Sequence, residues 1–111
     1  MAQTDVVLQS DAPQVDTAIP GLHRRTMATG ERVMVCEFFL ERGTVVPTHN
    51  HMHEQCGYVL SGSITFTIEG REHKLDVGDT YAIPGDIPHS AVANTDTVLV
   101  EVFSPPREEF R

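Results

Sequence analysis

The segment Thr48-His49-Asn50-His51-Met52-His53-Glu54-Gln55 places three histidines within eight residues. On an extended backbone, residues i and i+2 point to the same face of a strand, so His49 and His51 can offer their imidazoles to one metal ion. The same alternation places His53 and Gln55 on that face, and a local bend must decide between them. The segment therefore predicts a metal site built on a β-strand.

A fourth histidine stands at the start of another expected strand. His89 follows Pro88, far along the chain from the first pair, and a sheet closed into a barrel could bring it opposite that pair. Imidazole nitrogens with an amide or carboxylate oxygen suit Zn, Ni, Mn or Fe, and this donor set does not choose among them. Spacing alone leaves metal binding and a structural role equally open. We interpret His23 and His73 as structural.

The remaining sequence predicts short strands from about residue 22 to residue 103. Residues 63–69 alternate between apolar and polar side chains without a break, which is typical of a strand with one buried face. Residues 32–40 and 97–103 are rich in β-branched or aromatic side chains, and turns containing Gly or Pro separate the runs. Gly70-Arg71 indicates a tight turn. No stretch has a sustained helical period, so we expect an all-β antiparallel sandwich or small barrel.

The length of 111 residues allows one domain. We expect an N-terminal arm over residues 1–20 and the folded domain over residues 21–111. No apolar run is long enough to cross a membrane, and residues 1–16 are polar and acidic, unlike a secretory signal, so we expect a cytoplasmic protein.

The charge balance limits the possible partners. Sixteen acidic and eight basic residues give a net charge of -8, which disfavours binding to nucleic acid or to an anionic membrane. The two cysteines, Cys36 and Cys56, form no CxxC pair, and we expect two reduced thiols in the core. A small-molecule substrate remains the expected partner.

The order of glycines, histidines and prolines resembles two motifs of the cupin superfamily. The first is Gly43, five residues, His49-Asn50-His51, three residues, Gln55, six residues and Gly62; the second is Gly78, five residues, Pro84 and then His89. The resemblance implies a double-stranded β-helix, or jelly roll, with one divalent metal bound by His49, His51, Gln55 and His89. Homodimers are common among cupins, so the same analogy implies a homodimer.

Two positions depart from the usual cupin pattern. Glutamate often stands where this chain has Gln55, and the preceding Glu54 is a reserve ligand. Glycine usually stands where this chain has Asp86, and we expect the neighbouring Gly85 to supply the freedom that the turn needs.

A closer resemblance covers most of the chain. His51-Met52-His53-Glu54-Gln55, residues 57–62 and the tail Val102-Phe103-Ser104-Pro105-Pro106-Arg107-Glu108-Glu109-Phe110 are similar to the small cupins of pectin degradation. Those proteins convert 4,5-unsaturated monouronates into linear keto forms. The resemblance implies active-site roles for Glu101, Phe103 and Arg107, with Glu101 standing where the family has aspartate.

The alternation of the last strand agrees with that assignment. In residues 97–103, Leu99, Glu101 and Phe103 share one face and three valines share the other. A carboxylate on an apolar face is unfavourable unless it is solvated or paired, so Glu101 has a use if this face lines the barrel. Arg107 could hold a substrate carboxylate through two hydrogen bonds, or could be an ordinary surface residue.

Three functions are compatible with these features. The first is a metal-dependent tautomerase or ring-opening enzyme acting on unsaturated uronates. The second is a small cupin dioxygenase that uses Fe(II), since oxygen chemistry also needs open metal positions. The third is a non-catalytic cupin that binds a small molecule.

Overall fold

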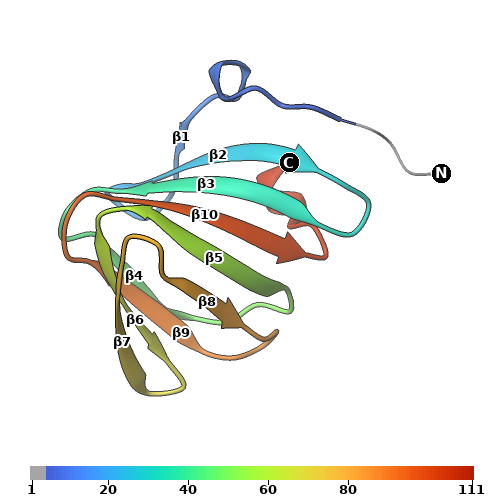
Figure 1. Ribbon diagram of the computed structural model, residues 1–111. Coiled ribbons are helices and arrows are strands. Elements are labelled where there is room, and N and C mark those ends of the chain that lie inside the picture. The colour runs from blue at the N-terminus through green and yellow to red at the C-terminus, as the bar shows by residue number, and fades with distance from the viewer. Residues whose placement is uncertain (1–4) are drawn as a thin grey trace.

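The structure is a computed structural model that describes residues 5–111. Its strands form two antiparallel sheets that pack face to face as a small jelly roll, which confirms the all-β prediction (Figure 1). The strands are β1 (Val15–Asp16), β2 (Leu22–Thr29), β3 (Met34–Leu40), β4 (Val45–His49), β5 (Glu54–Ser61), β6 (Ser63–Ile68), β7 (Arg71–Asp76), β8 (Thr80–Ile83), β9 (His89–Ala93) and β10 (Thr97–Ser104). Two short 3-10 turns, η1 (Gln9–Asp11) and η2 (Glu108–Phe110), lie near the ends of the chain. Within residues 5–111, no helix is long and apolar enough to span a membrane.

The larger sheet has the strand order β1-β2-β3-β10-β5-β8, and the smaller has the order β4-β9-β6-β7. In β10, Thr97, Leu99, Glu101 and Phe103 are buried, whereas the valines between them are partly exposed. This pattern matches the predicted alternation, because the inner face of β10 packs against the opposite sheet while the outer face meets solvent.

The hairpin between β6 and β7 turns one residue earlier than predicted. Glu69 and Gly70 form the turn with positive φ angles of 51° and 78°, and β7 begins at Arg71. Two consecutive left-handed residues suit the tight hairpin turns whose twist matches that of the strands.

One inner row of the larger sheet places a carboxyl group at the centre of the core. Glu101 of β10 pairs with Cys36 of β3 on one side and with Gly57 of β5 on the other, and Gly57 pairs with Tyr81 of β8. A Cβ at position 57 would collide with the Tyr81 ring, so glycine makes room for that ring beside Glu101. The core otherwise consists of apolar side chains from both sheets.

The prediction that Cys56 is a core residue is wrong. Cys56 is exposed, and it pairs with Val102 and Ala82 on the outer face of the larger sheet. Gln55 points into the barrel, so its neighbour Cys56 must point out, and the outer face has no second core to receive it. Cys36 is fully buried, as expected, and both cysteines are free.

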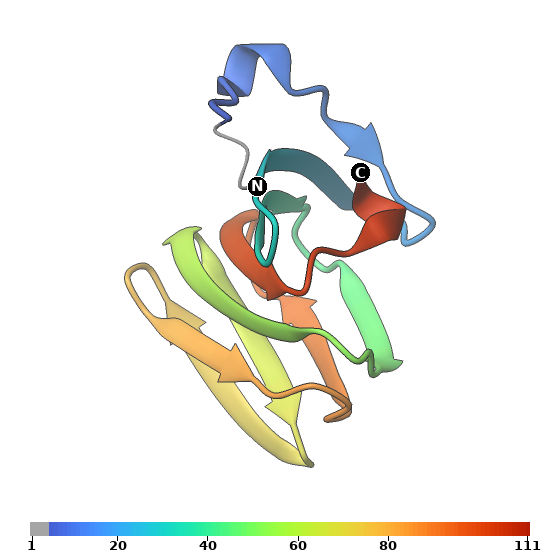
Figure 2. The same ribbon diagram turned by 90° about the vertical axis from the view of Figure 1, so that its right-hand side faces the viewer.

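Residues 5–20 of the predicted N-terminal arm run along the edge of the larger sheet next to β2 (Figure 2), and residues 1–4 lie outside the described residues. Strand β1 pairs with β2, and Arg25 donates hydrogen bonds to the carbonyls of Gln9 and Ala12. The His23 ring lies between the carboxylates of Asp16 and Glu41, at 2.7 and 2.8 Å, which raise its pKa. His23 is therefore a structural residue, as predicted.

Candidate metal centre and substrate cavity

Three histidines meet at the end of the barrel where β4 ends and β9 begins. His49 is the last residue of β4 and pairs directly with His89, the first residue of β9, and His51 lies in the loop that leads to β5. One ring nitrogen from each can be chosen so that all three lie within 4.8 Å of one another. This separation suits ligands that share one ion. The structure therefore brings together three of the four predicted metal ligands as a compact cluster.

Each histidine is oriented by a backbone carbonyl two residues away. The Nδ1–H groups donate to the carbonyls of Pro47, His53 and Ile87, at 2.9, 2.9 and 2.8 Å respectively. Because a carbonyl only accepts, these bonds place the proton of each neutral ring on Nδ1 and leave a lone pair on Nε2. The Nε2 atom of His89 is buried and has no hydrogen-bond partner in the described chain, as expected of an atom that awaits a ligand.

Gln55 is the fourth predicted ligand, and its surroundings fit the same interpretation. Its side-chain nitrogen donates to the Glu101 carboxylate, which turns its oxygen Oε1 toward His51. That oxygen lies 2.7 Å from the Nε2 atom of His51, so two lone pairs face each other. Such a contact is unfavourable unless a cation or a proton lies against both atoms. The residues present therefore fit a divalent metal ion.

The charge state of the histidines also suits metal binding. Burial lowers the pKa of His51 and of His89, and the positive charge of Arg107 lowers both further. Neutral imidazoles are the form that binds metals. The reserve ligand Glu54 is exposed on the outer face of β5, away from the cluster.

A loop contact holds the two parts of the cluster together. The backbone N–H of Asp86 donates to the carbonyl of His51, at 2.7 Å, and so ties the loop before β9 to the loop before β5. Asp86 itself adopts the left-handed conformation, with φ of 65°, which aspartate tolerates better than most residues. The expectation that Gly85 supplies this freedom is wrong. Gly85 is needed because a Cβ there would collide with the backbone of Met52.

Glu101 is buried beside the cluster. Only 7% of the residue is exposed, and burial raises the pKa of its carboxyl group to about 7, although Arg107 and the hydrogen bond from Gln55 partly oppose this rise. The Tyr81 hydroxyl is buried next to the Glu101 carboxylate, and burial together with the charge of Glu101 raises its pKa. A carboxyl group with a pKa near neutrality can both accept and donate a proton at physiological pH.

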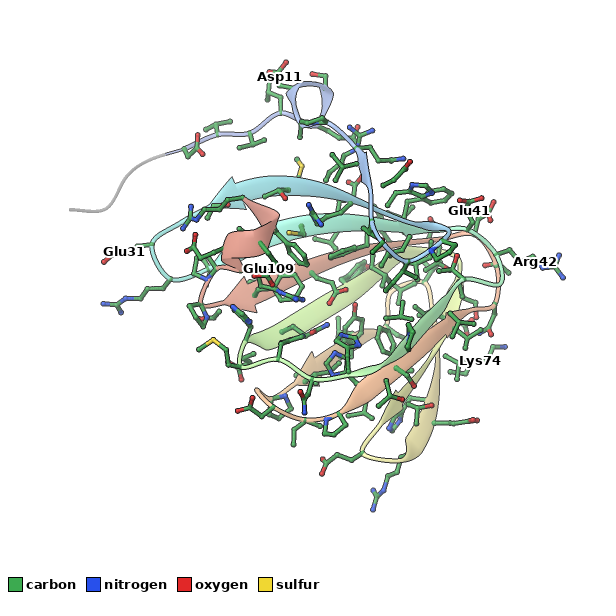
Figure 3. The ribbon with its side chains drawn as sticks, turned by 180° about the vertical axis from the view of Figure 1, so that it is seen from behind. Asp11, Glu31, Glu41, Arg42, Lys74 and Glu109 are labelled. Atoms are coloured by element: carbon green, nitrogen blue, oxygen red, sulfur yellow. The ribbon has the colours of Figure 1, made fainter. Side chains whose placement is uncertain are left out.

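The end of β10 and the tail that follows it bring the guanidinium group of Arg107 against the rings of Phe103 and Phe110. Arg107 lies over the ring of Phe103, with its guanidinium carbon 5.3 Å from the ring centroid, and its Nε donates to Glu109 at 2.7 Å. Glu109 is the middle residue of η2 and lines the cavity described below (Figure 3). Phe103 is buried, and its ring centroid lies 6.1 Å from that of His51. The three predicted active-site residues thus lie together near the histidine cluster.

A cavity of about 570 Å³ joins these groups. His49, His89, Gln55, Glu101, Phe103 and Arg107 all line it. Its wall also includes Thr17, Ala18 and Ile19 of the arm, together with Arg24 of β2, none of which the sequence analysis identified. Arg24 pairs with the inward-facing Phe38, and this register places its side chain on the inner face. Glu101 was identified because apolar side chains share its face of β10 and so mark that face as the inner one. The same pattern would have identified Arg24 only if apolar side chains had marked the inner face of β2.

Comparison with known families now places the chain. The model of the cupin domain family matches residues 36–104. The protein belongs to the cupin family. This cupin is 32% identical over 92 residues to the pectin degradation protein KdgF of Dickeya dadantii, an alignment that covers 81% of this chain and 84% of that protein.

Two further relatives extend the comparison. The structure of KdgF from Halomonas sp. superposes with a TM-score of 0.91 at 29% identity, over 98% of this chain and all of that one. The HTH-type transcriptional regulator PuuR of Escherichia coli is 34% identical over 84 residues, but the match covers 42% of that regulator. This cupin is therefore a relative of a pectin degradation protein over most of its length, and it shares only one part of the regulator.

Proposed function

We propose that this cupin is a metal-dependent enzyme that converts 4,5-unsaturated monouronates into linear keto forms. The observation that carries the proposal is one cavity lined by a buried carboxyl group, a guanidinium group, an aromatic ring and three of the four proposed metal ligands, with the fourth, His51, beside them. The relationship to a pectin degradation protein supports the choice of substrate class.

The metal is held, in this proposal, by His49, His51, Gln55 and His89. Zn, Ni, Mn or Fe would suit these donors. A divalent ion at this position supplies Lewis acidity, which polarises a substrate oxygen and stabilises negative charge during the reaction. Gln55 also connects the ligand set to Glu101 through its amide group.

The chemistry requires two proton movements without net gain or loss of atoms. Ring opening breaks the bond between the ring oxygen and the anomeric carbon; the anomeric hydroxyl loses its proton to become an aldehyde, and the ring oxygen becomes an enol. The enol hydroxyl then loses its proton while C4 gains one, which gives the ketone. Glu101 has a pKa of about 7 and lines the cavity, so it is our candidate for the acid and base in these steps.

Two residues position the substrate in this proposal. Arg107 binds the uronate carboxylate through its guanidinium group, which presents hydrogen-bond donors in a planar fork. Phe103 forms an apolar wall next to the sugar ring. Both residues line the cavity that contains Glu101.

The decisive experiment combines metal analysis with turnover. Purified protein with its metal content measured is incubated with unsaturated uronates released by a polysaccharide lyase, and loss of the C4–C5 double bond is followed by ultraviolet absorbance and NMR. We expect conversion by the wild type and by Glu101→Asp, which restores the family carboxylate, with Glu101→Gln slower by roughly 10²–10⁴. Absence of wild-type conversion would contradict the proposal.

Two other functions give different results in the same experiment. Uptake of oxygen with an organic substrate would indicate the Fe(II) dioxygenase. The similarity to part of a transcriptional regulator favours ligand binding as the second candidate, and binding of the uronate without turnover would indicate it. The expected cytoplasmic location and homodimer stay predictions.

A further inference from the structure

Arg24 is a cavity residue with an unusual lack of partners. It lies on the inner face of β2, opposite Phe38, and lines the cavity that contains Glu101. Its Nε atom is buried without a hydrogen-bond partner, and Arg24 forms no ion pair with any carboxylate in residues 5–111. Burying a guanidinium nitrogen without an acceptor is unfavourable, because the nitrogen loses water and gains nothing in return.

A second arginine lies on the same aromatic ring. The guanidinium carbons of Arg24 and Arg107 each lie 4.2 Å from the centroid of the Phe110 ring. The two carbons are therefore separated by no more than twice that distance. Contact with the ring stabilises each cation, but the two positive charges repel each other at this range.

The ring that carries this arginine pair is fixed to the barrel. The Thr26 hydroxyl of β2 donates to the carbonyl of Phe110, and the N–H of Phe110 donates to the carbonyl of Arg107 at 3.0 Å. The Phe110 ring also packs against Phe38 and Phe103, with centroids 6.1 and 5.7 Å away. The arginine pair thus belongs to a packed part of the cavity wall.

We propose that Arg24 is a second anion-binding residue of this cavity, and that the arginine pair binds short acids with a carboxylate at one end and a second carboxylate or carbonyl at the other. A guanidinium group has only donors, so it prefers oxygens that only accept. Such an acid relieves the repulsion between the two arginines and supplies the acceptor that Arg24 lacks. Arg107 is partly neutralised by Glu109, whereas Arg24 pairs with no carboxylate in the part of the chain that the structure describes.

The proposal also adds a residue to the uronate reaction, and in that respect it rests on the proposed function. Arg107 would bind the uronate carboxylate, and Arg24 would bind the carbonyl oxygen that appears at the opposite end when the ring opens. Arg24 would then favour the open form over the closed ring, which carries a hydroxyl there. Binding of simple diacids, however, requires no turnover.

Calorimetry with two acids of equal chain length tests the inference. Glutarate and pentanoate are titrated into the metal-loaded wild type, Arg24→Gln and Arg107→Gln; Arg71→Gln is the control, because it removes the same charge from an exposed position on β7. We expect the wild type and the control to prefer glutarate by about tenfold or more, which corresponds to one additional charge-assisted contact. Arg24→Gln should reduce the preference to about twofold or less. Arg24→Lys keeps the positive charge but loses the planar pair of guanidinium donors, so it should retain part of the preference for glutarate.

Two results would overturn the inference. One is a wild type that does not prefer glutarate, and the other is a folded Arg24→Gln variant, checked by its thermal midpoint, that keeps the full preference. The second result would leave Arg24 as a packing partner of Phe110. Glutarate preference in a protein that converts no uronate would contradict the proposed function and support this inference. Conversion of uronates by a protein that does not prefer glutarate would support the proposed function and contradict this inference.

Discussion

The histidine cluster and the arginine pair face the same cavity with opposite electrostatic needs. The histidine cluster and the neighbouring Gln55 gather lone pairs, including those of His51 Nε2 and Gln55 Oε1, which lie 2.7 Å apart. These lone pairs are satisfied only by a cation. The arginine pair gathers donors, including the buried Nε of Arg24, which has no acceptor within residues 5–111, and is complete only with an anion. The difference indicates a cavity that orients its ligand, because a ligand with acidic and neutral oxygens can enter productively in only one direction.

The largest expected effect is on the cluster. Replacing His51 and His89 together by Ala should abolish stoichiometric metal binding, because two of the four proposed ligands are lost. Elemental analysis of the purified variant measures the effect. His73→Ala, which changes an exposed histidine on β7, serves as the control and should keep its metal. Full metal content in the double variant would place the site elsewhere.

Glu101 contacts Gln55 on the cluster side and is influenced by the charge of Arg107 on the other side. Its replacement should lower the reaction rate without changing metal binding. Glu101→Gln keeps the size of the side chain, so we expect unchanged metal content but a rate lower by roughly 10²–10⁴. Steady-state kinetics on unsaturated galacturonate measure this. A wild-type rate in the variant would assign the proton transfer to another residue.

The arginine side should affect binding more than chemistry. Arg107→Gln should raise KM for uronates by about tenfold or more with a smaller change in kcat, because a contact to the substrate carboxylate is already made in the ground state. An equal loss in kcat and in kcat/KM would instead place the contact in the transition state. Arg71→Gln is again the matched control.

The buried carboxyl group gives a pH dependence of defined sign. The pKa of Glu101 is raised from 4.5 to about 7 in the folded protein, so the stability due to its proton is fully present below about pH 4.5 and is lost as the pH rises through 7. In metal-free protein, the free energy of unfolding of the wild type minus that of Glu101→Gln should therefore decrease over this range, by on the order of 3 kcal/mol. His51 and His89 titrate in both proteins, so their contribution cancels. Urea denaturation at several pH values measures the difference, and a constant difference would contradict the burial of the carboxyl group.

The smallest effects concern the two thiols. Cys36→Ala should lower the free energy of unfolding by about 1–3 kcal/mol, because it leaves space in the core, whereas Cys56→Ala should change it by less than about 0.5 kcal/mol. A thiol reagent should modify Cys56 and spare Cys36, whose pKa burial raises to about 11. Turnover per folded molecule should be unchanged in both variants, and an inactive but folded Cys56→Ala would contradict this.

The sequence predicted what local spacing determines. His49 and His51 were identified because residues two apart share a face, and the alternation of residues 97–103 placed Glu101 on the same face as Leu99 and Phe103, a face that the structure buries. The contacts of Arg24 with distant segments were missed. The inward position of Arg24 depends on its register with Phe38, and its closeness to Arg107 depends on how the tail folds onto β2. The error at Cys56 has a related cause, since alternation gives the direction of a side chain but not what lies there.

The carbonyl partners of the histidines have a consequence for any ion that the cluster holds. A carboxylate partner would make each imidazole more electron-rich, whereas the carbonyls of Pro47, His53 and Ile87 are neutral. Gln55 adds a fourth uncharged donor where the family often has glutamate. An ion in this ligand set would keep nearly its full double charge, unlike one coordinated by a carboxylate. The Glu101 carboxylate, which accepts a hydrogen bond from Gln55, offers one compensating charge, and an anionic substrate would complete the balance, so the uncharged coordination sphere itself favours acids over neutral sugars.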